Sequence, residues 1–304
     1  MDKQKVIHML DPMEHTSPFD INMAIDAGFD KVIPHSNVKL EQINSLVQDA
    51  IFSRGPSGVK NTSIFIGGRD INLAMDMLEA SKKAMVPPFE VSMLVDPSGA
   101  FTTAAALVAC VEKELKEKHN KELKNSNAVI FGGTGPVGIA TGVIVSLAGA
   151  KTTIVSHMSI ENAQSIASQY NKLCNSSMEG TYGCSDADKA YLLAYADIVF
   201  CVAKAGVEVL ADRVLGDAKS LKVAGDVNAV PPLGIRGMKV NDFGAPLKNA
   251  TNSDGAVGIG ALAIGDIKYN LQQALLHMMV ETDEPVYLDF RDAFTKAREL
   301  VCKK

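Results

Sequence analysis

The stretch that decides the fold reads Ala128-Val129-Ile130-Phe131-Gly132-Gly133-Thr134-Gly135-Pro136-Val137-Gly138. Its first four residues form a short apolar run that predicts a buried strand, and the apolar residues 139–148 after the glycines predict a helix. A new strand is expected from Lys151. A G-x-G-x-x-G pattern between a strand and a helix, inside a βαβ unit of roughly 30 residues, is the fingerprint of dinucleotide binding.

Each glycine has a physical role in that pattern. Gly133 permits the tight turn, Gly135 lets the backbone approach a pyrophosphate, and Gly138 lets the helix pack closely on the strand. Pro136 suits an early helical position, where its missing N–H costs nothing, and the helix N-terminus offers free N–H groups to phosphates. The alternative is a glycine turn that only packs the sheet. The expected pyrophosphate-binding residues are Gly133, Thr134, Gly135, Pro136, Val137 and Gly138.

The second strand of this unit ends in Ser156-His157-Met158-Ser159, without an acidic residue. In an NAD site an Asp or Glu at this point accepts a hydrogen bond from the ribose 2′-OH, whereas NADP sites place Arg nearby. Neither is present, and Ser156, His157 and Ser159 could donate to a 2′-phosphate. The sequence therefore allows NADP as well as NAD, and His157 is equally well explained as a solvent-facing loop residue.

The composition excludes several classes of function. The 304 residues carry 30 Lys and Arg against 35 Asp and Glu, a net charge of −5 without the basic excess that a nucleic-acid partner requires. The five cysteines contain no CxxC pair, so neither a disulfide framework nor a metal site is expected. The apolar run 6–10 is too short for a signal peptide or a membrane helix. We expect a cytoplasmic protein without a membrane partner.

Strand-like and helix-like segments alternate along both halves of the chain, which predicts an α/β protein with parallel sheets covered on their faces. We expect a Rossmann-type domain over residues 111–269 and a second α/β domain over residues 1–110, completed by helices in residues 270–304, with a cleft between the domains. The Lys- and Glu-rich segment 112–124 marks the junction. The expected strands are residues 5–10, 31–34, 63–66, 91–95, 128–131, 152–156, 198–202 and 222–224, and residues 288–301 are expected to form the last helix.

Several segments far from the glycine fingerprint complete a recognisable pattern. They are His8-Met9-Leu10, Ser17-Pro18-Phe19-Asp20, Phe65-Ile66-Gly67-Gly68, Val86-Pro87-Pro88-Phe89, Phe101-Thr102-Thr103-Ala104-Ala105, residues 226–235 and residues 258–265. With the fingerprint, they resemble the bacterial methylene-tetrahydromethanopterin dehydrogenases over nearly the whole chain. A generic dinucleotide-binding protein has no reason to share them.

The resemblance implies hydride transfer from methylene-tetrahydromethanopterin to NAD, NADP or both, in the oxidation of formaldehyde. It also implies a small-molecule substrate, a homo-oligomer and no metal. The protein supplies proximity and orientation, because nitrogen lone pairs beside the reacting carbon stabilise the methenyl cation. Two alternatives stay open: a dehydrogenase acting on methylene-tetrahydrofolate, and a non-catalytic protein that senses the dinucleotide.

Candidate site residues follow from the rule that ligands bind beyond the carboxyl ends of parallel strands. For the nicotinamide half of the cofactor these are Ala203, Lys204, Gly206, Asp226 and Asn228, unless these loops are ordinary strand exits. For the pterin they are His15, Thr16, Phe19, Asp20, Asp96, Ser98, Thr102 and Thr103.

Three residues, Asp20, Phe19 and Lys268, also have a purely structural interpretation. Asp20 could instead complement a helix N-terminus capped by Ser17, and Phe19 could be plain core. Lys268, which follows the glycine-rich segment 255–265, is the expected catalytic side chain, unless it is a solvated helix lysine.

Overall fold

The computed structural model describes residues 3–303 and divides the chain into two compact units. The first unit contains the chain up to Thr102 together with Tyr269–Lys296, and the second contains Thr103–Lys268 together with Ala297–Lys304. The first division falls between Thr102 and Thr103, inside the continuous helix α5 (Ala100–His119), which also contains residues 110 and 111, where the domains are expected to meet. Residues 1, 2 and 304, which the expected domain limits include, lie outside the described residues.

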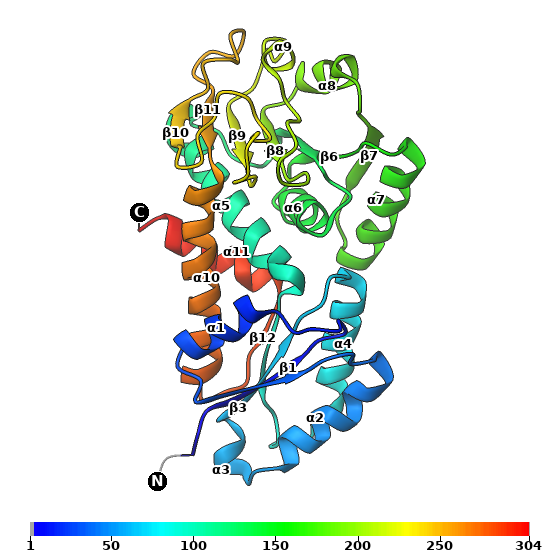
Figure 1. Cartoon of the computed structure of the whole chain (residues 1–304), viewed down its shortest axis with the longest axis vertical. Coiled ribbons are helices and arrows are strands. Elements are labelled where there is room, and N and C mark those ends of the chain that lie inside the picture. The colour runs from blue at the N-terminus through cyan, green and yellow to red at the C-terminus, as the bar shows by residue number, and fades with distance from the viewer. Residues whose placement is uncertain (1–2, 304) are drawn as a thin grey trace. The chain divides into compact units, whose positions relative to one another are not determined.

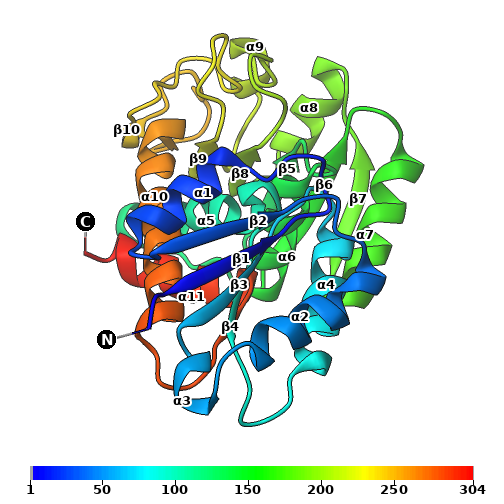
Figure 2. The same ribbon diagram turned by 60° about the horizontal axis from the view of Figure 1, so that its bottom comes forward.

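The first unit is built on a five-stranded sheet in the order β12-β4-β3-β1-β2, with every neighbouring pair parallel. Figure 2 shows β2, β1, β3 and β4 side by side, with α2 and α4 on one side and α1 on the other. The strands are β1 (Val6–Leu10), β2 (Lys31–His35), β3 (Thr62–Ile66), β4 (Ser92–Val95) and β12 (Tyr287–Leu288). The helices of this part of the chain are α1 (Pro18–Asp26), α2 (Ile43–Phe52), α3 (Pro56–Val59) and α4 (Ile71–Ala84).

Burial and capping explain these elements. Every residue of β3 and β4 is buried, as expected of central parallel strands, whereas β2 is mostly exposed and tolerates Pro34 because it is an edge strand. Helix α1 begins where the hydroxyl of Ser17 accepts a hydrogen bond from the Asp20 backbone N–H, and Asp70 caps α4 in the same way.

The second unit is built on a seven-stranded sheet in the order β10-β11-β9-β8-β5-β6-β7. From β7 to β11 all neighbours are parallel, in the strand order 3-2-1-4-5-6 of the doubly wound dinucleotide-binding fold, and β10 adds an antiparallel edge. The strands are β5 (Asn127–Phe131), β6 (Lys151–Ser156), β7 (Met178–Tyr182), β8 (Ile198–Cys201), β9 (Val223–Asp226), β10 (Phe243–Pro246) and β11 (Val257–Ile259).

Helices cover both faces of this sheet (Figure 1). Residues of β5 and β6 alternate between the faces: Ile130 and Ile154 lie against α6, while Val129 and Val155 join a core with residues of α8 and α9. The helices here are α6 (Pro136–Leu147), α7 (Ile160–Cys174), α8 (Asp186–Leu193) and α9 (Asp212–Leu215), and α10 (Ala261–Glu281) and α11 (Phe290–Val301) are divided between the units.

The predicted α/β class and parallel sheets are confirmed, and the expected strands are present with slightly different ends. Four strands were missed: β7, β10, β11 and β12. The helix expected from Leu288 begins at Phe290, because Leu288 belongs to β12 and pairs with Leu94 of β4. Of the helices between residues 3 and 303, none combines the length and the apolarity that crossing a membrane requires.

Helix α7 packs on β7 through a glycine, and this contact yields a test of the fold. A Cβ atom on Gly180 would lie 2.3 Å from the backbone carbonyl of Ala163, far inside contact distance. We expect Gly180→Val to destabilise the protein by on the order of 3 kcal/mol, because backbone must move to admit the side chain. The measurement is the midpoint of urea unfolding.

The matched control is Gly265→Ala, because nothing lies within 4 Å of a Cβ placed on that helical glycine. Alanine has a higher helix propensity than glycine, so this variant should unfold at an equal or higher urea concentration. Equal midpoints for Gly180→Val and the parent protein would contradict the packing described here.

Candidate functional site

The glycine loop of the second unit joins β5 to α6 at the carboxyl edge of the sheet. Gly132 has a φ of +78°, and a Cβ there would lie 2.6 Å from the backbone nitrogen of Ala203. The left-handed turn therefore falls at Gly132 and not at Gly133, where the sequence placed it. A Cβ atom on Gly133 would lie 2.7 Å from the Cβ of Ile154, so the glycine at this position makes room for the Ile154 side chain. A Cβ on Gly138 would lie 2.3 Å from the carbonyl oxygen of Gly132, so the helix rests directly on the loop.

The first turn of α6 is open to a ligand. Gly135 is the N-cap residue, no side chain caps the helix, and Pro136 occupies the first turn. A Cβ on Gly135 would contact only the Gly132 carbonyl oxygen, at an ordinary 3.6 Å. Thr134 and Val137, beside it, are partly exposed. The N–H groups of a first helical turn have no partner within the helix, and together with the helix dipole they attract an anion such as a pyrophosphate.

The loop beyond β8 lies against the glycine loop, since Ala203 contacts Gly132. Lys204 is exposed, and Gly206 has a φ of +76°. The Gly206 backbone N–H donates to Oδ1 of Asn228 over 3.1 Å, which ties this loop to the one after β9. The structure thus brings the candidate nicotinamide loops together at the carboxyl edge, next to the glycine loop.

Asp226 and Asn228 shape the loop after β9 through hydrogen bonds within the chain. Asp226 is buried, and its two carboxylate oxygens accept from the backbone N–H groups of Asn228 at 2.9 Å and Ile235 at 3.0 Å. Burial raises the pKa of Asp226, and these hydrogen bonds oppose the rise. Asn228 also donates to the Pro232 carbonyl oxygen and accepts from the Val230 backbone N–H.

The polar side chains that follow β6 form hydrogen bonds with one another and with the backbone of the same loop. The buried Ser156 hydroxyl donates to Oδ1 of Asn162 over 3.0 Å and accepts from the Met158 backbone N–H. Ser159 is the N-cap of α7 and accepts from the Asn162 backbone N–H. His157 is exposed. Sequence reasoning passed over Glu161, an acidic residue in the first turn of α7.

In the first unit, Asp96 organises the loop after β4. Its Oδ1 accepts from the backbone N–H groups of Phe101 at 2.9 Å and Thr102 at 3.2 Å, and its Oδ2 accepts from the Thr102 hydroxyl at 2.6 Å. Ser98 has a φ of 54° and donates its hydroxyl to the Gly68 carbonyl oxygen. Asp96, Ser98 and Thr102 therefore lie together beyond β4, beside the loop that follows β3.

A second group of polar side chains lies beyond β1. Asp20, only 5% exposed, accepts a 2.7 Å hydrogen bond at Oδ1 from the side-chain amide of Gln272 in α10, which is fully buried. Burial raises the pKa of Asp11, the Met13 backbone N–H lowers it, and the carboxylate of Asp20 raises it further. Two buried carboxyl groups thus influence one another at this edge of the sheet.

Asp11 and Gln272 were missed from the sequence. Asp11 directly follows β1, so the strand-end rule that selected Asp96 could have found it. Gln272 lies 252 residues from its partner Asp20 and offered no local signal.

The remaining candidates are placed as follows. The Thr16 and Ser36 hydroxyl oxygens are 3.4 Å apart, while His15 is exposed and Phe19 is 48% exposed, so Phe19 is not plain core. Thr103, in α5, and Lys268, in α10, are partly buried and belong to the second unit. Across residues 3–303, no three His, Cys, Asp or Glu side chains are grouped so as to hold a metal ion.

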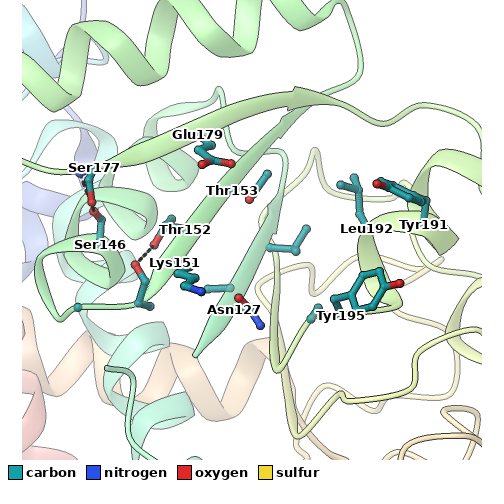
Figure 3. Close-up of a pocket in the computed structure, with 15 residues that line it drawn as sticks. Asn127, Ser146, Lys151, Thr152, Thr153, Ser177, Glu179, Tyr191, Leu192 and Tyr195 are labelled. Carbon is teal, nitrogen blue, oxygen red and sulfur yellow. Dashed lines mark hydrogen bonds between the residues drawn. The ribbon is translucent and has the colours of Figure 1, made fainter. Parts of the chain in front are cut away.

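A groove of about 630 Å³ lies at the opposite, amino edge of the second sheet (Figure 3). It is lined by the first residues of β5 and β6, Asn127 and Lys151, and by Tyr191 and Tyr195 at the end of α8. The glycine loop follows the last residue of β5, so this groove is not part of the candidate dinucleotide site.

The strand order and the open glycine loop define a Rossmann-type dinucleotide-binding protein. Solved structures support the fold. The quinate dehydrogenase of Corynebacterium glutamicum in complex with NAD is 13% identical, superposes with a TM-score of 0.54, and the match covers 99% of each chain.

Sequence relatives identify the family. Residues 18–98 match the family described as "Methylene-tetrahydromethanopterin dehydrogenase, N-terminal". The NAD(P)-dependent methylenetetrahydromethanopterin dehydrogenase of Methylorubrum extorquens is 43% identical, over 98% of this chain and 99% of that protein. The "Bifunctional protein MdtA" of the same organism is 31% identical over the same shares. The chain belongs to the methylene-tetrahydromethanopterin dehydrogenase family, which confirms the resemblance.

The first sheet contains a pair of neighbouring histidines, one of which, His8, has a lowered pKa. Nδ1 of His8 in β1 lies 3.1 Å from Nε2 of His35 at the end of β2. Burial lowers the pKa of His8 below 6.5, and His35 and Arg54 lower it further. Because the folded protein then binds protons less readily than the unfolded chain, His8 contributes stability above about pH 6.5 that is lost as the pH falls through its lowered pKa.

We expect the urea midpoint to fall between pH 7.5 and pH 5.5, and to fall less in His8→Gln, which keeps a hydrogen-bonding side chain without titrating. The control is His277→Gln, at an exposed histidine of α10, which should keep the parent pH dependence. An identical pH dependence in His8→Gln and the parent would show that the pKa of His8 is not lowered in the folded protein.

Proposed function

We propose that this chain is an NAD(P)-dependent oxidoreductase that transfers a hydride from methylene-tetrahydromethanopterin to the nicotinamide, in one-carbon metabolism that oxidises formaldehyde. The observation that carries the proposal is the 43% identity to a protein of that named activity along 98% of the chain. The dinucleotide-binding geometry of the second unit agrees with it.

The reaction needs little acid–base chemistry from the protein. The methylene carbon transfers a hydride, which is a proton with two electrons, to C4 of the nicotinamide. The carbon becomes a methenyl cation that is stabilised by its two nitrogen neighbours. No proton is left over for a general base. Positioning the two reactants is the contribution of the chain, and this effect can supply roughly 7–11 kcal/mol of barrier lowering.

For the cofactor, the chain offers the first turn of α6 to the pyrophosphate and the loop after β8 to the nicotinamide half. That loop contains Ala203, Lys204 and Gly206. The hydrogen bonds of Asp226 and Asn228 fix the shape of the adjacent loop after β9. Asp226 and Asn228 are thus positioning residues in this proposal, because their hydrogen bonds go to the backbone of the loop.

For the substrate, the chain offers the carboxyl edge of the first sheet. Asp20, oriented by Gln272, presents a carboxylate to the N–H donors of a pterin edge, and the exposed Phe19 offers a flat apolar surface. His15 and Thr16 flank this group, and Asp96, Ser98 and Thr102 form the neighbouring loop, with Thr103 following in α5. Lys268 in α10 supplies a cation that orients the reacting bridge.

The proposal extends to the setting of the enzyme: a homo-oligomer acting in the cytoplasm on a small-molecule substrate. The family resemblance supports the oligomer, and the scattered cysteines support a reducing compartment.

The test is nicotinamide reduction by the purified protein, followed by absorbance. Methylene-tetrahydromethanopterin and methylene-tetrahydrofolate are each supplied with NAD and with NADP. Turnover that is faster with the methanopterin carrier supports the proposal. Faster turnover with the folate carrier assigns the protein to that substrate, and dinucleotide binding without turnover on either carrier assigns it a sensing role.

Gly135→Asp tests the pyrophosphate position. Aspartate is a favoured N-cap residue and the backbone there has a φ of −85°, so the fold and the stability of α6 should be kept. We expect NAD(P) affinity to fall at least about 100-fold, or about 3 kcal/mol, because a negative side chain takes the place of the pyrophosphate. Calorimetric titration measures the affinity. Parent-like affinity in a folded variant would remove the pyrophosphate from this position.

Lys268→Ala tests the catalytic side chain. We expect kcat to fall by on the order of 100-fold, the scale of loss that small misplacements of reactants produce, while NAD(P) affinity stays within about twofold. Lys172→Ala, at an exposed lysine of α7, is the charge-matched control and should keep parent kinetics. Unchanged kcat in Lys268→Ala would take Lys268 out of the site.

A further inference from the structure

The first turn of α7 lies where a dinucleotide-binding fold meets the ribose of the adenosine. β6 is the strand next to β5, it ends at Ser156, and α7 begins at Ile160. In this fold the end of the second strand carries the group that distinguishes the 2′-OH of NAD from the 2′-phosphate of NADP. The residues that decide this choice must therefore come from residues 156–162 or from their neighbours.

Two hydrogen-bond donors of this loop are used within the loop itself. The Ser156 hydroxyl donates to the Asn162 side chain, and the Asn162 backbone N–H donates to Ser159. Residues 156–162 contain no lysine or arginine. The loop therefore lacks the cationic partner that usually recognises a 2′-phosphate.

The loop contains one acidic side chain, that of Glu161. Glu161 is exposed in the first turn of α7, and its own backbone N–H and the Ser159 hydroxyl hold the pKa of its carboxyl group below the usual value. The carboxylate is ionised near neutral pH, as an exposed glutamate ordinarily is, and it belongs to the first turn of the helix, where the helix dipole attracts anions.

We propose that Glu161 is a specificity-determining residue that makes this chain prefer NAD over NADP. Its carboxylate occupies the anion-binding end of α7, accepts a hydrogen bond from the ribose 2′-OH of NAD and repels the 2′-phosphate of NADP. The inference rests on the proposed dinucleotide site and deepens it: an acid one helical turn beyond the strand replaces the acid that is missing from the strand end. Selectivity then arises from repulsion as much as from attraction.

The experiment measures the dissociation constants of NAD and NADP by calorimetry for the parent, Glu161→Gln and Glu161→Gln/Ser159→Ala. We expect the parent to bind NAD more tightly. Glu161→Gln should shift the NAD-to-NADP affinity ratio toward NADP by about tenfold, because it removes the negative charge that repels the 2′-phosphate and leaves only neutral acceptors beside the Ser159 hydroxyl. The double variant should lose part of the gained NADP affinity, because the Ser159 hydroxyl is gone.

The matched control is Glu179→Gln. Glu179 is exposed on β7 of the same sheet and lines the groove at the amino edge of that sheet. The substitution therefore removes the same charge as Glu161→Gln, but at a position away from the proposed cofactor site. Its affinity ratio should equal that of the parent. Circular dichroism checks that all variants are folded.

The possible outcomes separate this inference from the proposed function. A parent that prefers NADP, or a Glu161→Gln variant with an unchanged ratio, overturns the role of Glu161 even if turnover is observed. A shifted ratio in a protein that turns over neither carrier supports Glu161 and overturns the proposed reaction. Binding of neither dinucleotide overturns both.

Discussion

The second unit depends on the close approach of backbone to backbone around the glycine loop. The Gly132 carbonyl lies where a side chain on Gly138 would stand, and the backbone at Ala203 lies where a side chain on Gly132 would stand. Helix α6 and the loop after β8 can meet β5 this closely only because these positions carry no Cβ. Gly135 in the same loop is open and α6 has no side-chain cap, so the loop that packs the sheet also leaves the first turn of α6 without a side-chain partner.

Elsewhere, polar side chains at the carboxyl edges of the strands mostly bind the chain's own backbone. Asp96 caps the start of α5, Asp226 and Asn228 hold the loop after β9, and Ser159 caps α7. A buried polar group costs free energy unless it is hydrogen-bonded, so such residues fix loop shape before they can serve a ligand. A side chain caps α1, α4, α7 and α8, whereas α6 has no side-chain cap, as is also true of α2 and of the four-residue helices α3 and α9. What distinguishes α6 is that its uncapped first turn follows the glycine loop.

Local sequence pattern was enough to predict the buried parallel strands and the glycine loop, because burial on both faces leaves a continuous apolar run. It failed at the sheet edges: β7 reads Met-Glu-Gly-Thr-Tyr and is half-exposed, and β12 has two residues. The unit boundary inside α5 left no loop to mark it. For the candidate site residues, strand ends in the sequence nominated the loops but not the hydrogen-bond partners, because the Asp20–Gln272 hydrogen bond joins residues that only the fold brings together.

The two recognition tasks of such an enzyme rest on different elements of this chain. In the proposed function, the carrier is assigned to the carboxyl groups beyond β1 and to Gln272 of α10, within the first unit, whereas the dinucleotide is assigned to the backbone of α6 and the loops of the second unit. Interactions that share no partner contribute independently to free energy. Under the proposed function, a substitution at the end of β6 is therefore expected to change the selection between dinucleotides without changing the residues that are proposed to bind the pterin.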